Sequence, residues 1–333
     1  MSTSPFQHKH AAHCESGVIS SMLTHHGLAL SEAMVFGLSS ALSFAYLPFV
    51  KLGGMPLIAY RSMPKSIIKG LQKSTGLKMK FEKFSNSQLG SERLDTLLAE
   101  GKIVGAQTSV FWLPYFPEEM RFHFNAHNLM VINKQKEGYT ISDPVFENLV
   151  YADQVSLTKA RFVKGVMAPK GTLYYPTDVP KSIDYQTVLP KCIKKTAKTM
   201  LNTPVPIAGL KGIAYLSKHI RKLAKKDPQY AKLFLGHIIR MQEEIGTGGA
   251  GFRYIYASFL QQASDLINNS TLLEASKMMT ETGDAWREFA LLIAKSIRAK
   301  NKKPIDFIAI ADKLDAVAAQ EKQVYQKLLS AFA

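Results

Sequence analysis

A cysteine at the expected start of a helix is the first residue of this sequence that could do chemistry. Cys14 follows the histidine-rich run 6–13 and precedes residues 15–23, whose apolar positions recur at helical spacing. A thiol at the N-terminus of a helix lies at the positive end of the helix dipole, which favours the nucleophilic thiolate. Cysteine is also a common inert core residue, so this interpretation needs a base and an orienting group elsewhere in the chain.

A histidine and an aspartate at hairpin spacing supply those two groups. Residues 127–133 and 139–143 are rich in β-forming residues and flank a polar stretch with a glycine, which predicts an antiparallel hairpin. If the turn is centred near Gln135, His127 and Asp143 lie directly opposite each other. The proline after Asp143 should end the strand and leave the carboxylate at the sheet end.

Together these three residues could form a Cys-His-Asp triad. Cys14 would be the nucleophile, His127 the base and Asp143 the group that fixes the imidazole tautomer. Each residue also has a plain structural interpretation: a packed thiol, a hydrogen-bonded histidine at a strand start and an Asp-Pro turn. The matched spacing of all three favours a site.

Several short motifs resemble the family of butirosin biosynthesis protein H. In the first part of the chain they are residues 13–27 and 31–38, Leu113-Pro114-Tyr115, His127 and Ser142-Asp143-Pro144. In the second part they are residues 246–253, Tyr256, Phe259, Leu260 and residues 283–288, which resemble the helical domain that usually follows. The likeness spans most of the chain in patches, and the order and spacing of the motifs make it fairly specific.

The resemblance implies an α+β, papain-like cysteine-peptidase-type N-terminal domain followed by an all-helical C-terminal domain. It assigns Cys14, His127 and Asp143 the triad roles given above. It implies an acyltransferase for biosynthesis, which moves an acyl or aminoacyl group from a carrier-protein or CoA thioester to a small-molecule amine. The phosphopantetheine thioester would then be a substrate, and no tightly bound cofactor is expected.

The residues that stabilise the oxyanion are open at this point. Peptidases of this type often use a glutamine a few residues before the cysteine, and Gln7 or His8 could take that place. Backbone N–H groups at the helix start would contribute as well. His13 and Glu15, which flank the cysteine, are further candidates for the pocket.

A glycine-rich stretch at residues 246–251 has two interpretations. It lacks the Lys-Ser/Thr ending of a phosphate loop and follows no expected strand, so a nucleotide site is disfavoured. It is either a tight turn between helices, which we favour, or a loop near a pantetheine phosphate. In the second case Arg253 and Tyr256 would be the substrate contacts.

The formal charge of +16 is concentrated in one region. Residues 191–232 contain eleven Lys and Arg against a single acid, Asp227. Such a cluster indicates an acidic partner, for which an acyl carrier protein is the candidate, or a solvated helix face that keeps the protein soluble. Nucleic acid is disfavoured, because neither interleaved aromatic residues nor a known docking motif accompanies the charges.

The order of periodic patterns predicts two domains. Strands are expected at 56–60, 77–84, 103–112 and 171–175, and helices at 64–73 and, after a Ser91 cap, at 92–99. From about Cys192 onward only helical patterns occur. The boundaries are therefore placed at 1–178 for the α+β catalytic domain and 190–333 for the helical domain, with a linker that contains Pro176, Pro180 and Pro190.

Composition bounds the compartment and the remaining alternatives. Two cysteines, Cys14 and Cys192, make no disulfide framework, and the first residues do not resemble a signal peptide. The uncharged stretch 33–50 is too short and polar for a membrane span and is expected to be a core helix or pocket wall. We therefore expect a soluble cytoplasmic protein.

Three alternatives stay open beside the transferase. His8, His10 and His13 with Cys14 suggest a zinc site, but their spacing fits no familiar one, and no metal is predicted. The same triad could use water as a cysteine peptidase or amidase. The domain could also be a non-catalytic papain-like binding protein.

Overall fold

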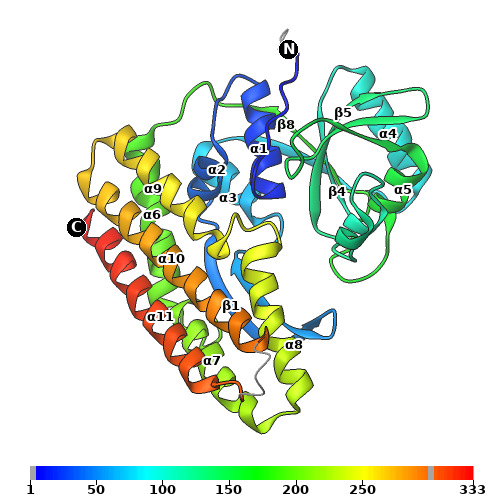
Figure 1. Ribbon diagram of the computed structural model, residues 1–333. Coiled ribbons are helices and arrows are strands. Elements are labelled where there is room, and N and C mark those ends of the chain that lie inside the picture. Colours follow the sequence, from blue (N-terminus) through cyan, green and yellow to red (C-terminus); the bar gives the residue numbers. More distant parts are fainter. Residues whose placement is uncertain (1–4, 299–303, 333) are drawn as a thin grey trace. The chain divides into compact units, whose positions relative to one another are not determined.

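The computed structural model describes residues 5–298 and 304–332, and the chain divides into two compact units (Figure 1). The first combines the chain up to Val35 with Ile67–Ile183, and the second combines Phe36–Ser66 with the chain from Asp184 onward. The sequence placed residues 36–66 in the first domain, whereas they pack with the helical unit. Nothing in the sequence indicated that residues 36–66 leave the first unit and that the chain returns to it afterwards.

The first unit is built on a six-stranded sheet whose strands pair antiparallel. Its order is β3 (Lys78–Glu82), β8 (Leu173–Asp178), β4 (Val104–Thr108), β5 (His127–Lys134), β6 (Gly138–Ser142) and β7 (Val150–Asp153). Every residue of the central strand β4 is buried, because both faces of the sheet are covered. Strands β3, β4 and β8 lie where the sequence predicted them.

Helices cover both faces of this sheet. The helix α1 (Cys14–His25) contacts β5, whereas α4 (Ser87–Ala99) and α5 (Gln154–Phe162) contact β4 and its neighbours. This part of the chain also forms α2 (Glu32–Leu38), α3 (Ser66–Thr75) and the short 3-10 turns η1 (Val110–Trp112) and η2 (Glu118–Met120). Figure 1 shows α1 on one side of the sheet and α4 and α5 on the other. Leu94 and Leu157 from α4 and α5 share a core with Val104, Leu129 and Val131 of the sheet.

Helix α4 begins earlier than the sequence predicted. Asn86, and not Ser91, is its N-cap, and its side-chain Oδ1 accepts the Leu89 N–H at 3.0 Å. Ser91 lies buried inside the helix. Both residue types are good N-caps, and the choice between them depends on where the chain leaves β3.

The stretch 33–50, which was predicted to be a core helix or pocket wall, is divided between a helix and a strand. Helix α2 ends at Leu38, and Ser40 adopts a left-handed conformation with φ of 55°. The chain then forms β1 (Leu42–Leu52), which pairs antiparallel with β2 (Met55–Arg61), the strand that was predicted at 56–60. Aromatic residues such as Phe44 and Tyr46 favour a strand once a partner strand is available.

The second unit joins this hairpin to a helical C-terminal region, as the sequence predicted for residues 190–333. Its α-helices are α6 (Tyr185–Asn202), α7 (Gly209–Lys222), α8 (Pro228–Ile239), α9 (Arg253–Ile267), α10 (Ser270–Arg298) and α11 (Phe307–Ser330). The short elements are η3 (Leu223–Lys225), the π-helical turn η4 (Arg240–Glu244) and η5 (Ala250–Phe252). Pro190 lies inside α6, so the linker is shorter than predicted.

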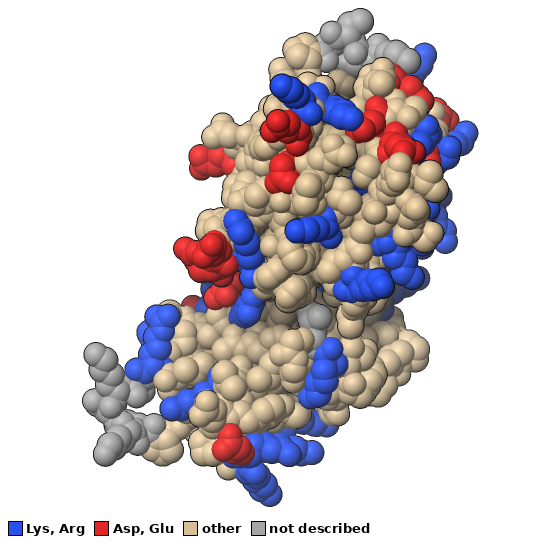
Figure 2. All heavy atoms as spheres, turned by 90° about the vertical axis from the view of Figure 1, so that its right-hand side faces the viewer, with Lys and Arg blue, Asp and Glu red and all other residues tan. Residues whose placement is uncertain are grey.

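The basic residues of region 191–232 lie on α6, α7, η3 and α8, except Lys226, which follows η3. Arg221 pairs with Asp312 and Asp315 of α11, and Lys194 donates to the Phe332 carbonyl at 2.7 Å. Most of the other lysines in this region are exposed. On the face drawn in Figure 2, Lys and Arg are spread over the surface and acidic side chains gather in a few places. None of the helices in the described part of the chain is both long and apolar enough to cross a membrane.

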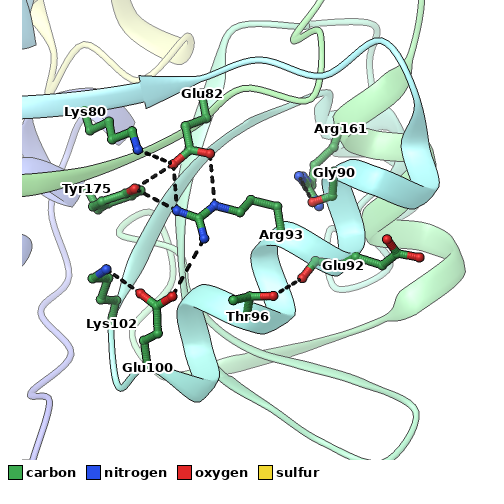
Figure 3. Close-up of polar contacts among 10 residues, drawn as sticks. All are labelled: Lys80, Glu82, Gly90, Glu92, Arg93, Thr96, Glu100, Lys102, Arg161 and Tyr175. Atoms are coloured by element: carbon green, nitrogen blue, oxygen red, sulfur yellow. Dashed lines mark hydrogen bonds and ion pairs between the residues drawn. The ribbon is translucent and has the colours of Figure 1, made fainter.

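A partly buried network of ion pairs and hydrogen bonds ties α4 to the strands β3 and β8 (Figure 3). Arg93 donates from Nε and Nη2 to the two carboxylate oxygens of Glu82, at 3.0 and 3.1 Å. The Tyr175 hydroxyl donates to Glu82 Oε1 at 2.6 Å and accepts from Arg93 Nη2 at 3.2 Å. Hydrogen bonds from Arg93, and then from Tyr175, lower the pKa of Glu82 to about 2 despite partial burial.

This network predicts how the stability of the first unit depends on pH. Because the pKa of Glu82 is depressed in the folded state, its contribution is present above the ordinary value of 4.5 and is lost as pH falls through about 2. Glu82→Gln should lower the free energy of unfolding by about 1 kcal/mol at neutral pH and flatten its slope between these values. Urea denaturation at several pH values measures this.

The matched control is Glu92→Gln on α4. The Glu92 carboxylate is exposed and accepts one hydrogen bond, from Gln88 at 3.0 Å. It should leave the unfolding curve and its pH slope nearly unchanged. Equal slopes for the wild type and Glu82→Gln would contradict the role assigned to the network.

Candidate active site

Cys14 is the first residue of helix α1, as the sequence predicted. His13 is the N-cap, and its Nδ1 accepts the Ser16 N–H at 3.3 Å. The side chain of Cys14 is buried, with 7 % of its surface exposed. The N-terminus of a helix is the positive end of its dipole, so the start of α1 favours a negative charge on or next to Cys14.

A carboxylate from α2 fixes the chain immediately before the cysteine. Glu32 accepts the His13 N–H at 2.7 Å, the Ala12 N–H at 3.0 Å and the Ser16 hydroxyl at 3.1 Å. Burial raises the pKa of Glu32, and these hydrogen bonds oppose the rise. Glu32 therefore holds the start of α1 in place, and nothing in its sequence context signalled this role.

His127 and Asp143 meet at the ends of two neighbouring strands. His127 begins β5, and Asp143 follows the last residue of β6. His127 Nε2 lies 2.7 Å from Asp143 Oδ2, and both side chains are buried. The same Oδ2 accepts the Tyr115 hydroxyl at 2.9 Å, and Oδ1 accepts the Val145 N–H at 3.3 Å.

The hairpin register differs from the predicted one. The structure pairs Met130 with Ser142, so Asp143 does not lie directly opposite His127, whose strand partner is Thr108 on β4. The turn closes one residue later than assumed, and an irregularity follows Val131. The two side chains still meet because the chain ends its strand at Asp143, as the proline predicted.

The charge state of His127 is set by this environment. Burial lowers its pKa, but the charge and hydrogen bond of Asp143, and then contact with Cys14, raise it to about 10. Since Nε2 is bonded to Asp143, Nδ1 is left for the contact with the thiol. The Asp143 carboxylate therefore favours the imidazolium form of His127, which lies between the carboxylate and the sulfur.

Two further residues approach Cys14 from β5 and β8. Asn128 Nδ2 lies 4.0 Å from the Cys14 Sγ, and the Tyr174 hydroxyl donates to Asn128 Oδ1 at 3.0 Å. Sequence reasoning missed Asn128, Tyr174 and the role of Tyr115. The last of these stands in the Leu-Pro-Tyr motif, which was the one available signal.

The predicted oxyanion and pocket residues have different environments. His8 lies 2.8 Å from the Ser142 hydroxyl through Nδ1 and 2.9 Å from the Phe146 carbonyl through Nε2. Because a carbonyl only accepts, Nε2 carries the hydrogen and Nδ1 accepts from Ser142. Both ring nitrogens of His8 are thus engaged with other partners, and neither is left to donate to an oxyanion.

The other candidates divide between the surface and the interior. Gln7 is exposed, His13 is buried as the helix cap, and Glu15 is buried on α1. The charge of Glu15 acts on Tyr174, whose pKa is raised well above its usual value by burial first and then by Glu15 and Cys14. Glu15 thus belongs to the surroundings of the thiol.

Arg253 and Tyr256 are not substrate contacts. Both are fully buried in the second unit. Arg253 donates to Glu321 at 2.6 Å and to the Gly251 carbonyl at 2.7 Å, and its guanidinium lies 4.9 Å from the centre of the Trp286 ring. A guanidinium enclosed in this way cannot bind an external phosphate.

The glycine-rich stretch is therefore a tight turn, the favoured interpretation. Gly249 and Gly251 have φ of 84° and 55°, which side chains rarely adopt. A Cβ on Gly251 would lie 2.2 Å from the ring of Tyr60. Glycines are needed in this loop because a side chain at Gly251 would clash with the ring of Tyr60.

The buried Arg253–Glu321 pair predicts a large effect on stability and none on the thiol. Arg253→Ala would leave the Glu321 carboxylate uncompensated and should cost about 3–5 kcal/mol of unfolding free energy. In folded Arg253→Ala protein, Cys14 should be alkylated at the same rate as in the wild type. Thermal unfolding and peptide mass spectrometry measure the two effects.

Arg287→Ala is the control for this substitution. Arg287 is largely exposed and makes a longer ion pair of 3.6 Å with Glu243, so its removal should hardly change stability. Equal losses from the two variants would contradict the importance of burial.

Metal ligation finds no support in the described residues. Within residues 5–298 and 304–332, no group of three or more His, Cys, Asp or Glu side chains comes together in a way that could hold an ion.

Two sequence families match the chain. Residues 13–144 match "Butirosin biosynthesis protein H, N-terminal", and this range contains Cys14, His127 and Asp143. Residues 155–328 match "Domain of unknown function (DUF4872)". The chain belongs to the butirosin biosynthesis protein H-like family. The sheet unit and the helices that follow it confirm the predicted α+β N-terminal part with a helical C-terminal region.

Comparison with solved structures and curated proteins adds little to the family assignment. One solved structure, described as a C39-like peptidase from Bacillus anthracis, is 15 % identical and has a TM-score of 0.36. The matched region spans 54 % of this chain and 98 % of the chain in that structure. No curated protein matches the sequence.

The His127–Asp143 pair predicts a shift that can be measured directly. In Asp143→Asn, the largest contribution that opposes burial is removed and only the contact with Cys14 remains, so the pKa of His127 should fall well below 10. Tyr115→Phe should move it less, because the carboxylate remains. NMR titration of the imidazole protons measures this.

His237 is the internal reference for that titration. Burial lowers its pKa, and its Nε2 bonds to the Pro56 carbonyl at 2.9 Å in the second unit. Its titration should be the same in all variants. A wild-type His127 that titrates near 6.5 would contradict the ionic pair.

Proposed function

We propose that this protein is a cysteine-dependent acyltransferase that transfers an acyl or aminoacyl group from a thioester to an amine. The observation that carries the proposal is the buried 2.7 Å bond between His127 and Asp143, with the other imidazole nitrogen facing Cys14 at a helix start. This arrangement suits a nucleophilic thiol with a base that can deliver and accept a proton.

Acylation would begin from the ion pair of Cys14 thiolate and His127 imidazolium, with attack of the thiolate on the thioester carbonyl carbon. A new S–C bond forms, the tetrahedral intermediate collapses, and the bond to the donor sulfur breaks. The imidazolium of His127 gives its proton to the departing thiol. Both the broken and the formed bonds are thioester bonds, so the step is nearly balanced in energy and suits a cysteine relay.

Deacylation would use the neutral imidazole that acylation leaves behind. An amine attacks the acyl carbon, His127 takes its proton, and the Cys14–acyl bond breaks to give the amide. The raised pKa of His127 is consistent with this role, because the imidazole must hold the proton it receives. The same site would be an amidase or peptidase if water took the place of the amine.

The proposed acyl donor is a phosphopantetheine thioester on an acyl carrier protein, or CoA. Support comes from the exposed lysines of region 191–232, such as Lys191, Lys195 and Lys198 on α6, which offer positive charge to an acidic partner. The proposed acceptor is a small-molecule amine. Membership in a family named for a biosynthesis protein favours transfer in a biosynthetic setting.

The first test is the reactivity of Cys14 toward iodoacetamide as a function of pH. We expect Cys14 to be alkylated at neutral pH at least about tenfold faster in the wild type than in His127→Ala. Cys192, which is buried and donates to the Leu38 carbonyl at 3.0 Å, is the internal control. Equal rates in both proteins would count against an activated thiol.

A second measurement separates transfer from hydrolysis. Cys14 would be loaded with an acyl-pantetheine thioester, and loss of the acyl group would be followed by intact-protein mass spectrometry with and without a panel of amines. Amide formation with retention of the acyl-enzyme in water supports the transferase. Rapid loss in water alone, unchanged by amines, would make the protein a thiol hydrolase.

A further inference from the structure

Asn128 contacts the catalytic sulfur from the face of β5 opposite to His127. Consecutive strand residues point to opposite faces, and the His127 ring packs on Phe116 of the α4/α5 core. Asn128 instead lies on the α1 side, where its Nδ2 is 4.0 Å from the Cys14 Sγ. The two side chains therefore reach the thiol from different directions.

The orientation of the Asn128 amide is fixed by its other partners. Nδ2 donates to the Ala126 carbonyl at 3.1 Å, and a carbonyl can only accept, so the nitrogen must lie on that side. Oδ1 accepts the Tyr174 hydroxyl at 3.0 Å. The second N–H of Nδ2 is left for the sulfur side. Asn128 and Tyr174 are both buried, which keeps water from competing for these bonds.

The residue usually expected to donate to the oxyanion is occupied here. Of the two residues predicted for this role, His8 has both ring nitrogens engaged with Ser142 and Phe146, and Gln7 is exposed. A buried side-chain donor would therefore come from another element.

We propose that Asn128 donates the side-chain hydrogen bond to the oxyanion, together with backbone N–H groups at the start of α1, and that Tyr174 positions its amide. This inference rests on the proposed nucleophilic role of Cys14. In the tetrahedral intermediate the acyl carbon is bonded to Sγ, and the oxyanion lies one atom further out. A donor 4.0 Å from the sulfur can therefore come within hydrogen-bond distance of that oxygen.

The test compares two reagents that modify the same sulfur, one through an oxyanion and one without. p-Nitrophenyl acetate acylates a thiol through a tetrahedral intermediate: the S–C bond forms, the C–O bond breaks and p-nitrophenolate leaves. Iodoacetamide alkylates the same sulfur by direct displacement of iodide and forms no oxyanion. Both rates would be measured at Cys14 in the full chain with Cys192→Ser as background.

Asn128→Ala should slow acylation by about 100-fold to 1000-fold and leave the rate and pH profile of alkylation within about threefold. Tyr174→Phe frees the amide without removing it and should give a smaller loss of acylation, about tenfold. It also keeps the proposal testable if Asn128→Ala does not fold. Asn125→Ala is the matched control, because this buried amide bonds to the Val166 carbonyl at 2.9 Å.

The outcomes separate this inference from the proposed function. Equal losses of acylation and alkylation would show that Asn128 acts on the thiol itself, and no loss of either would remove it from the site; both results overturn the proposal. A thiol that is not activated relative to His127→Ala would defeat the proposed function. The ratio of the two rates would still report whether Asn128 serves an oxyanion.

Discussion

The buried hydrogen bond between His127 and Asp143 is the interaction on which the arrangement of the site depends. A charged imidazole and a carboxylate away from water are costly unless each compensates the other and their remaining groups are bonded. Tyr115 and Val145 satisfy the aspartate, and the thiol of Cys14 faces the free imidazole nitrogen. The ends of β5 and β6, the turn before β5 and the start of α1 must therefore stay in register with one another.

Local sequence signals were sufficient to find these three residues. The start of α1, the hairpin and the strand end at Asp143 follow from helical periodicity, β-rich runs and a proline, all of which act over a few residues. The register within the hairpin was missed, because the irregularity after Val131 depends on packing against β4 and the core. The pairing of His127 with Asp143 survived the error since both lie at strand ends.

Contacts between distant residues explain what the sequence could not predict. Arg253 was a candidate phosphate contact in the less favoured interpretation of the glycine-rich stretch, but its partner Glu321 lies 68 positions away in the same core. Glu32 gave no sign that it holds the chain before Cys14. The stretch 33–50 contains a strand because β2 lies beside it, and the hairpin belongs to the second unit. In each case a long-range partner decided between two locally acceptable structures.

Because side chains alternate along β5, two consecutive residues of this strand, His127 and Asn128, contact different parts of the site. His127 on one face faces the core and the aspartate, while Asn128 on the other faces α1 and Tyr174. A slip of one residue would exchange the two side chains and lose both contacts with the sulfur. The pairs Thr108–His127 and Gln107–Asn128 with β4 prevent this slip. Because β4 is buried along its whole length, its packing on both faces fixes the register that the site requires.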